Sequence, residues 1–119
     1  MAIEVGAIVI HCFEFEAMVD FWQEALDYRP RRPASGGWLT LIDPEGRRPS
    51  LSFQQRERKR DRRNWIHLDL YAGSRENQAA EVERLIGLGA KEYPWRYPPR
   101  ADYVVLEDPD GNLFCVIGH

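Results

Sequence analysis

Two residues with chemically active side chains, His67 and Asp69, stand two positions apart in a segment that alternates apolar and polar residues. Alternation with a period of two is typical of a β-strand, and it places residues two apart on the same face of the sheet. Histidine titrates near neutral pH, so beside a carboxylate it is a candidate general acid or base. The pair is equally compatible with structural hydrogen bonds in a β-rich core.

Further polar residues are expected near this pair. Tyr71 follows on the same strand face, and His11 is expected to share a face with Ala7 and Val9 on an earlier strand. If both faces line one cavity, these side chains gather around the pair. The predicted polar group is His11, His67, Asp69 and Tyr71.

Metal binding is a second interpretation of the same region. Imidazole and thiolate are good zinc ligands, so His11, His67 and Cys115 are an alternative metal set if three strands converge. The other interpretation of Cys115 is a small buried side chain, which is the commonest role of a free cysteine. The remaining cysteine, Cys12, is far away in the sequence, and neither a disulfide framework nor a zinc knuckle is predicted.

Aromatic residues form another group that suggests ligand binding. Three tryptophans, Trp38, Trp65 and Trp95, fall at predicted strand starts or in loops, where indole rings stack on planar ligands or form lids and dimer contacts. Residues 93–100 (YPWRYPPR) are stiffened by prolines and are predicted to lie over a pocket or against a partner subunit. Arg96 or Arg100 in this segment would attract an anionic substrate, although solvated surface arginine is the commoner role.

These residues need strands and helices to position them. Residues 4–13 are almost continuously apolar and β-branched, which predicts a central strand buried on both faces. Residues 15–27 change to a helical period, and residues 38–42 and 50–54 predict a hairpin around the turn DPEG at 43–46. The apolar stripe of the helix is Phe15, Met18, Val19, Trp22 and Leu26.

The second half of the chain repeats this order of elements. Its predicted elements are a strand at 65–71, a helix with its N-cap at Ser74 and its C-cap near Gly89, a weak strand at 93–96, a strand at 103–106, the turn DPDG at 108–111 and a strand at 113–117. The apolar stripe predicted for this second helix is Ala79, Val82, Leu85, Ile86 and Gly89.

The repeat predicts an α+β protein built from two βαβββ modules. The domain is 1–119, with module one at 1–55, a basic linker at 56–63 and module two at 64–119. One module cannot cover both faces of its sheet, so we expect the two to form a curved, barrel-like sheet around a cleft, with the helices outside. The alternative is a coincidence of two common turns.

Composition limits the classes of function. Hydrophobic residues make up 44% and charged residues 29%, as in ordinary folded domains. A net charge of −3 argues against nucleic-acid binding, and the basic linker, which alone resembles a nucleic-acid or acidic-ligand patch, is interpreted as a solvated connection. No apolar stretch long enough for a membrane span and no export leader is recognised, so a cytoplasmic location is expected.

Several motifs together resemble one known family. They are Phe21-Trp22 followed by Ala25-Leu26, the segment NWIHLDL at 64–70, Leu88-Gly89-Ala90, and DPDGNLFCV at 108–116. This pattern, which spans nearly the whole chain, resembles the glyoxalase-like domain branch of the vicinal oxygen chelate (glyoxalase/bleomycin resistance/dioxygenase) superfamily. The resemblance implies the paired βαβββ fold, a U-shaped cavity for a small molecule and a homodimer.

In metal-dependent members of the superfamily, ligands come from the first and last strand of each module. The resemblance places them here at Ala7, Ser52 (or Gln54), His67 and Cys115. His67 alone is a standard ligand, alanine cannot coordinate, and Cys115 stands where glutamate is usual. No metal or other cofactor is therefore expected, although a divalent metal remains an alternative.

The predicted function is metal-independent binding of a small molecule, in the manner of drug-sequestering resistance proteins. The predicted ligand-binding residues are His11, Trp38, Ser52, Gln54, His67, Asp69, Tyr71 and Cys115. One alternative is a lyase, isomerase or dioxygenase-type enzyme that uses His67 and Asp69 in catalysis, or His67 in a non-standard metal site. Another is a dimeric scaffold with a vestigial cleft. Neither nucleic acid nor membrane is an expected partner.

Overall fold

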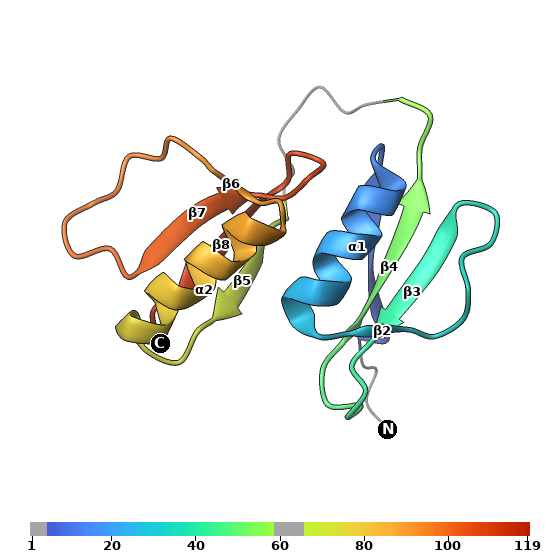
Figure 1. Cartoon of the computed structure of the whole chain (residues 1–119), viewed down its shortest axis with the longest axis horizontal. Coiled ribbons are helices and arrows are strands. Elements are labelled where there is room, and N and C mark those ends of the chain that lie inside the picture. The colour runs from blue at the N-terminus through green and yellow to red at the C-terminus, as the bar shows by residue number, and fades with distance from the viewer. Residues whose placement is uncertain (1–4, 59–65) are drawn as a thin grey trace. The chain divides into compact units, whose positions relative to one another are not determined.

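The computed structural model describes residues 5–58 and 66–119, and the chain divides into two compact units, Met1–Arg60 and Asp61–His119. Each unit holds a four-stranded mixed sheet and one helix (Figure 1). The fold is therefore α+β with a repeated βαβββ order, as predicted. Of the predicted basic linker, residues 59–63 lie outside the described residues, as do Asn64 and Trp65.

The first unit contains five elements in βαβββ order. They are β1 (Ala7–Cys12), α1 (Phe15–Leu26), β2 (Arg29–Pro30), β3 (Trp38–Ile42) and β4 (Ser50–Gln55). The strand order in the sheet is β1-β4-β3-β2, in which β1 runs parallel to β4 and the other neighbours are antiparallel. The short β2 completes the module and has no counterpart among the elements expected from the sequence.

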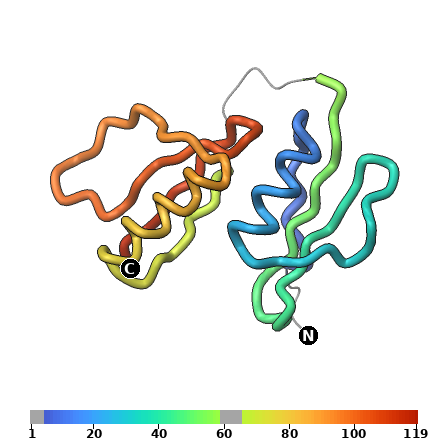
Figure 2. Tube along the Cα trace, in the orientation of Figure 1, coloured from blue at the N-terminus to red at the C-terminus, as the bar shows by residue number. Residues whose placement is uncertain are grey.

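The second unit repeats this topology. Its elements are β5 (Leu68–Tyr71), α2 (Arg75–Leu88), β6 (Lys91–Glu92), β7 (Tyr103–Glu107) and β8 (Leu113–Ile117). The strand order is β5-β8-β7-β6, with β5 parallel to β8. The trace of this unit runs from yellow to red in Figure 2. Because the two strand orders correspond one to one, the internal repeat inferred from the sequence is a repeat of structure.

Helix α1 packs on its sheet through the predicted stripe. Met18, Val19 and Trp22 are buried, and Phe21 joins them with its ring edge-on to the indole at a centroid distance of 5.0 Å. The helix ends at Leu26 because Asp27 takes a left-handed conformation (φ 55°). The prediction of an end near this residue is thus confirmed.

The buried face of helix α2 overlaps the predicted stripe only in part. Leu85 is buried, but Ala79 and Ile86 are exposed, and the polar Gln78 is buried in their place. The Gln78 side-chain amide donates to the backbone oxygens of Asp102 and Val116, both at 2.9 Å. These two hydrogen bonds therefore determine which side of α2 faces the sheet. The pattern of apolar residues does not predict this role of Gln78.

Two strand predictions are wrong in position or environment. β1 ends the strand order of its sheet and shows alternating exposure, with Val9 47% exposed, so it is neither central in that sheet nor buried on both faces. The sequence of β1 is continuously apolar, but the exposure of its side chains alternates along the strand. The weak strand expected at 93–96 is absent from the described elements, and β6 lies at Lys91–Glu92, before Pro94 removes a backbone donor.

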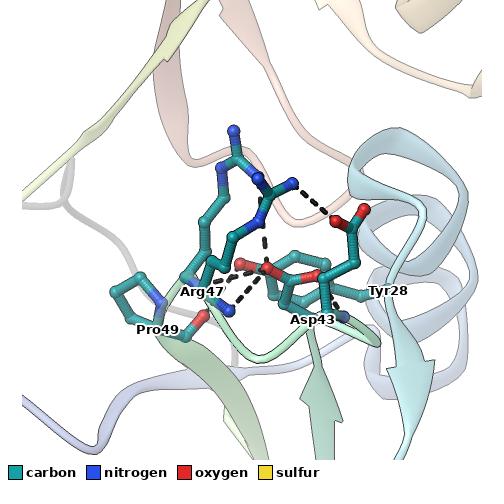
Figure 3. A network of polar contacts seen from close by, with 6 residues as sticks. Tyr28, Asp43, Arg47 and Pro49 are labelled. Carbon is teal, nitrogen blue, oxygen red and sulfur yellow. Dashed lines mark hydrogen bonds and ion pairs between the residues drawn. The ribbon is translucent and has the colours of Figure 1, made fainter.

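The two predicted turns are built in the same way. The carboxylate of Asp43 accepts backbone N–H groups of Glu45 and Arg47, at 2.9 and 3.2 Å (Figure 3). In the second module Asp108 accepts the N–H groups of Asp110 and Asn112, both at 2.9 Å. Each aspartate thus satisfies donors that the tight turn leaves without a ladder partner.

Tyr28 connects the end of α1 to the first of these hairpins. Its hydroxyl donates to the backbone oxygen of Pro49 at 2.8 Å, directly before β4 (Figure 3). Burial, and then the nearby carboxylate of Asp43, raise the pKa of Tyr28, so the phenol keeps the proton that makes this bond.

Candidate functional site

The candidate site lies on the face of the second sheet opposite α2. Parallel pairing places Asp69 opposite Cys115 and Leu68 opposite Phe114. Phe114 is buried on the face that α2 covers, so by alternation the side chains of Asp69 and Cys115 project from the other face. We call this surface, with Tyr71 included, the open face of module two.

His67 directly precedes β5 and contacts Asp69. The distance from Nε2 of His67 to Oδ1 of Asp69 is 3.1 Å, and the two side chains are 54% and 46% exposed. The predicted sharing of one face is confirmed by this contact. The pair combines a group that donates or accepts a proton with a carboxylate that orients it, and both remain accessible to a ligand.

Cys115 lies beside this pair. Burial first, and then the negative charge of Asp69 and a hydrogen bond to its carboxylate, raise the pKa of the Cys115 thiol to about 11. The thiol is therefore protonated at neutral pH, and it donates to the carboxylate. In this state Cys115 is a weak nucleophile, because the thiolate is the reactive form.

The three side chains are also close enough for one cation. One ligand atom each of His67, Asp69 and Cys115 lies within 4.8 Å of the others. Zinc bonds of about 2.0 to 2.3 Å require ligand atoms a little closer than this limit. Asp69 joins His67 and Cys115 here, while the metal set expected from sequence combined them with His11, which lies in the other unit.

Tyr71, the fourth residue expected here, is 73% exposed. It pairs in register with Ile117, and its ring lies 5.4 Å from that of His119. A second histidine–carboxylate contact is formed by His119, whose Nδ1 lies 2.8 Å from Oδ2 of Asp102. No local spacing in the sequence predicts this C-terminal pair, because its members are 17 residues apart.

The remaining predicted ligand-binding residues belong to the first unit. His11 is exposed, and both of its ring nitrogens contact the Arg56 guanidinium, at 3.0 and 3.3 Å. It pairs in register with Gln54, while Val9 pairs with Ser52, so the face expected for His11 is confirmed. Sequence reasoning missed Arg56, because it was assigned to a solvated linker.

Ser52 and Gln54 are held by contacts within their own sheet. The Ser52 hydroxyl is 1% exposed and lies 2.8 Å from the hydroxyl of Thr40, and Gln54 donates to the backbone oxygen of Gly37 at 3.3 Å. Trp38, opposite Gln54 in register, is 39% exposed. Of these three residues Trp38 therefore offers the most side-chain surface to a ligand.

The structure brings together His67, Asp69 and Cys115 within one unit. His11, Trp38, Ser52 and Gln54 lie in the other unit, so the predicted constellation of His11 with His67 stays a prediction. Within the described residues no helix is long and apolar enough to cross a membrane.

Comparison with known proteins identifies the family. The model of the glyoxalase-like domain matches residues 7–117, so the chain belongs to the glyoxalase-like domain family of the vicinal oxygen chelate superfamily. The comparison with curated proteins gave no match.

Solved structures share the fold at low sequence identity. A glyoxalase/bleomycin resistance protein/dioxygenase family enzyme from Burkholderia phytofirmans PsJN has a TM-score of 0.75 and 18% identity, over 93% of this chain and 94% of that chain. The fosfomycin resistance protein FosX from Listeria monocytogenes has a TM-score of 0.77 and 14% identity, over 100% of this chain and 93% of that chain. A mutant of that protein was solved with Mn(II) and 1S,2S-dihydroxypropylphosphonic acid.

The ligand places that the resemblance implies do not fit a metal ion here. Ala7 offers a methyl group, and the Ser52 hydroxyl is buried against Thr40. Ala7 therefore lacks a donor atom and Ser52 is already paired, while Gln54, the alternative to Ser52, keeps its amide oxygen. His67 and Cys115 keep donor atoms, and their neighbour Asp69 supplies a third.

Proposed function

We propose that this protein binds a small molecule at the open face of module two without a resident metal, as a sequestering protein. The observation that supports this most is the 3.1 Å contact between His67 and Asp69 beside a protonated Cys115. This arrangement offers hydrogen-bond donors and an acceptor at an accessible surface. It does not offer the four-ligand set of the metal-dependent superfamily members.

The proposed binding chemistry follows from the three side chains. Asp69 accepts a hydrogen bond from a ligand hydroxyl or amine, while the His67 ring donates or accepts according to its protonation. Tyr71, 73% exposed on the same strand, adds an aromatic surface against which an apolar part of the ligand packs. We further propose contributions from His11, Trp38, Ser52 and Gln54.

A second candidate function is enzymatic and rests on the proximity of three ligand atoms within 4.8 Å. In that case His67 is an acid or base in a lyase or isomerase reaction, or His67, Asp69 and Cys115 hold a divalent ion. The two candidates differ in one measurable property, which is whether metal binds stoichiometrically to the wild-type chain.

We propose to test both functions by NMR titration of ¹⁵N-labelled protein. Fosfomycin and metal-free bleomycin are the first probes, because similar solved structures carry fosfomycin resistance and bleomycin resistance in their names. With a chelator present, sequestration predicts saturable shifts at the amides of His67, Asp69 and Cys115. Zn(II) is then titrated without the chelator.

Two variants make the test specific. Asp69→Asn removes the carboxylate charge and is expected to weaken bleomycin binding about tenfold, because amine and hydroxyl groups of that probe donate to a carboxylate. Fosfomycin is an anion without such donors, so its affinity should not fall. Glu83→Gln neutralises an exposed carboxylate on α2 and should leave binding unchanged. Shifts confined to residues outside the open face would contradict the proposed site. Stoichiometric Zn(II) binding that His67→Ala abolishes would favour the enzymatic candidate.

The remaining properties are proposed together with this function. We propose a single domain over residues 1–119, a homodimer and a cytoplasmic location. We propose no nucleic-acid partner, in keeping with the net charge of −3.

A further inference from the structure

A cavity of about 480 Å³ lies within module two, away from the residues of the open-face site. It is bounded by β7, by the first turns of α2 and by the segment between β6 and β7, which loops out beside the sheet (orange in Figure 1). His67, Asp69, Tyr71 and Cys115 are not among its lining residues. Its volume is in the range of small-molecule sites.

The side chains around this cavity suit a flat ligand that carries a negative charge. Three tyrosines and two arginines line it against a single acid, Glu92. These five residues are Tyr93, Tyr97, Tyr103, Arg75 and Arg100. Tyrosine rings give an apolar surface on which a planar group packs, and guanidinium groups pair with carboxylates in a bidentate way.

Two of the tyrosines also present donors. The Tyr97 hydroxyl accepts the backbone N–H of Val105 at 2.8 Å, and the Tyr103 hydroxyl accepts the indole N–H of Trp95 at 3.2 Å. Because each hydroxyl oxygen accepts from the protein, its own hydrogen is directed elsewhere. Each hydroxyl therefore keeps a donor for a ligand that accepts hydrogen bonds.

Arg100 occupies a backbone position that costs conformational energy. Its φ is 62°, and the hydrogen bond from the N–H of Ala101 to the oxygen of Pro98 makes it the third residue of a tight turn. Glycine is favoured at that position when φ is positive. Asp27, the other such residue among those described, caps a helix, whereas Arg100 has no capping role.

From these observations we propose that the cavity is a second ligand site, which binds a small aromatic carboxylate. The carboxylate pairs with Arg100 and Arg75, and the aromatic ring packs against the tyrosines. Binding of the ligand by the Arg100 guanidinium would explain why an arginine occupies a turn position that favours glycine. This site is independent of the function proposed for the open face.

The probe for this proposal is 2-naphthoate, with 2-naphthalenemethanol as a neutral molecule of the same ring size. Binding to the full-length ¹⁵N-labelled protein is followed at the amides of Ala101 and Val105, of which the second donates to Tyr97. We expect saturable shifts with the carboxylate and much weaker ones with the alcohol. Absence of shifts at millimolar naphthoate, or equal affinity for both probes, would overturn the proposal.

Arg100→Gly separates binding from folding. Glycine relieves the backbone cost, so thermal stability should be unchanged or higher, while naphthoate affinity should fall about fivefold or more from the lost charged hydrogen bond. Arg96→Ala is the matched control, because Arg96 lies in the same segment but does not line the cavity. Equal losses of affinity in the two variants would mean general charge attraction and would also overturn the proposal.

Discussion

Asp69 influences both of its neighbours, and its effect on Cys115 can be measured in solution. Burial is the larger cause of the raised pKa of the Cys115 thiol, about 11, and Asp69 adds to it by charge and hydrogen bonding. We predict that Asp69→Asn lowers this pKa only in part, since burial remains. The pH dependence of iodoacetamide alkylation reports the change, because only the thiolate reacts.

The alkylation experiment is made in a Cys12→Ala background with a chelator present. Cys12 is buried and is the other cysteine of the chain, so its removal leaves a single reporter thiol. In the Cys12→Ala protein that keeps Asp69, the alkylation rate of Cys115 should rise with pH around a raised midpoint. A midpoint near the pKa of an ordinary cysteine would show that the burial of Cys115 and its contact with Asp69 do not persist in solution.

Asp43 makes the free energy of unfolding depend on pH in the acidic range. Backbone hydrogen bonds, that from Glu45 first, outweigh burial and lower the pKa of the Asp43 carboxyl. A carboxyl with a lowered folded-state pKa stabilises the fold above its unfolded pKa, and this contribution is lost as the pH falls through the folded value. We predict that Asp43→Asn reduces the loss of stability on acidification, measured by urea unfolding at several pH values. Asp20→Asn, on an exposed site of α1, should keep the wild-type profile.

At the scale of elements, Gln78 is predicted to secure α2 to the sheet. Gln78→Met keeps a similar volume but removes the amide donor from the backbone oxygens of Asp102 and Val116. The Asp102 oxygen still accepts the N–H of Gly118 at 2.7 Å, so the free energy of unfolding should fall by about 1 to 2 kcal/mol. Gln23→Met on α1 is the control and should cost much less, because Gln23 is only half-buried. Chemical denaturation measures both. Equal losses would contradict an anchoring role for Gln78.

The sequence predicts elements well where a local rule determines them. Asp43 and Asp108 mark turns because a short carboxylate satisfies nearby backbone donors, and the α1 stripe follows from helical spacing. It predicts poorly where tertiary contacts decide. The continuous apolar run around Val9 does not distinguish a central strand from one at the end of its sheet, and the burial of Gln78 depends on two carbonyls distant in sequence.

The candidate site was predictable to a similar extent. The contact between His67 and Asp69 follows from strand spacing alone. The position of Cys115 beside Asp69 required the register of two strands that are more than 40 residues apart, which no local pattern contains. The contact of His11 with Arg56 was not predicted, because a charged segment after a strand was interpreted as solvated.

At the scale of the whole molecule, two modules of one topology differ in their chemistry. The open face of module two carries His67, Asp69 and Cys115 together, whereas the corresponding face of module one carries Ala7, the paired hydroxyls of Ser52 and Thr40, and a single histidine, His11, in contact with Arg56. The repeat thus preserved the turns and strand order in both halves. The groups suited to proton transfer or metal binding are concentrated in the second, which also contains the proposed carboxylate cavity.

The sheet faces opposite the helices also predict association. One helix covers only one face of a four-stranded sheet. Val9, on the other face of the first sheet, is 47% exposed. We expect a second copy of the chain to cover part of this surface, so that light scattering gives about twice the mass of 13.9 kDa. Val9→Asp places a charge in that contact and should shift the mass toward the monomer while circular dichroism remains unchanged. Thr40→Ser, which keeps the hydroxyl paired with Ser52 and adds no charge to the same sheet, should remain dimeric. A wild-type protein that is monomeric at every concentration would show that a second copy does not cover this face.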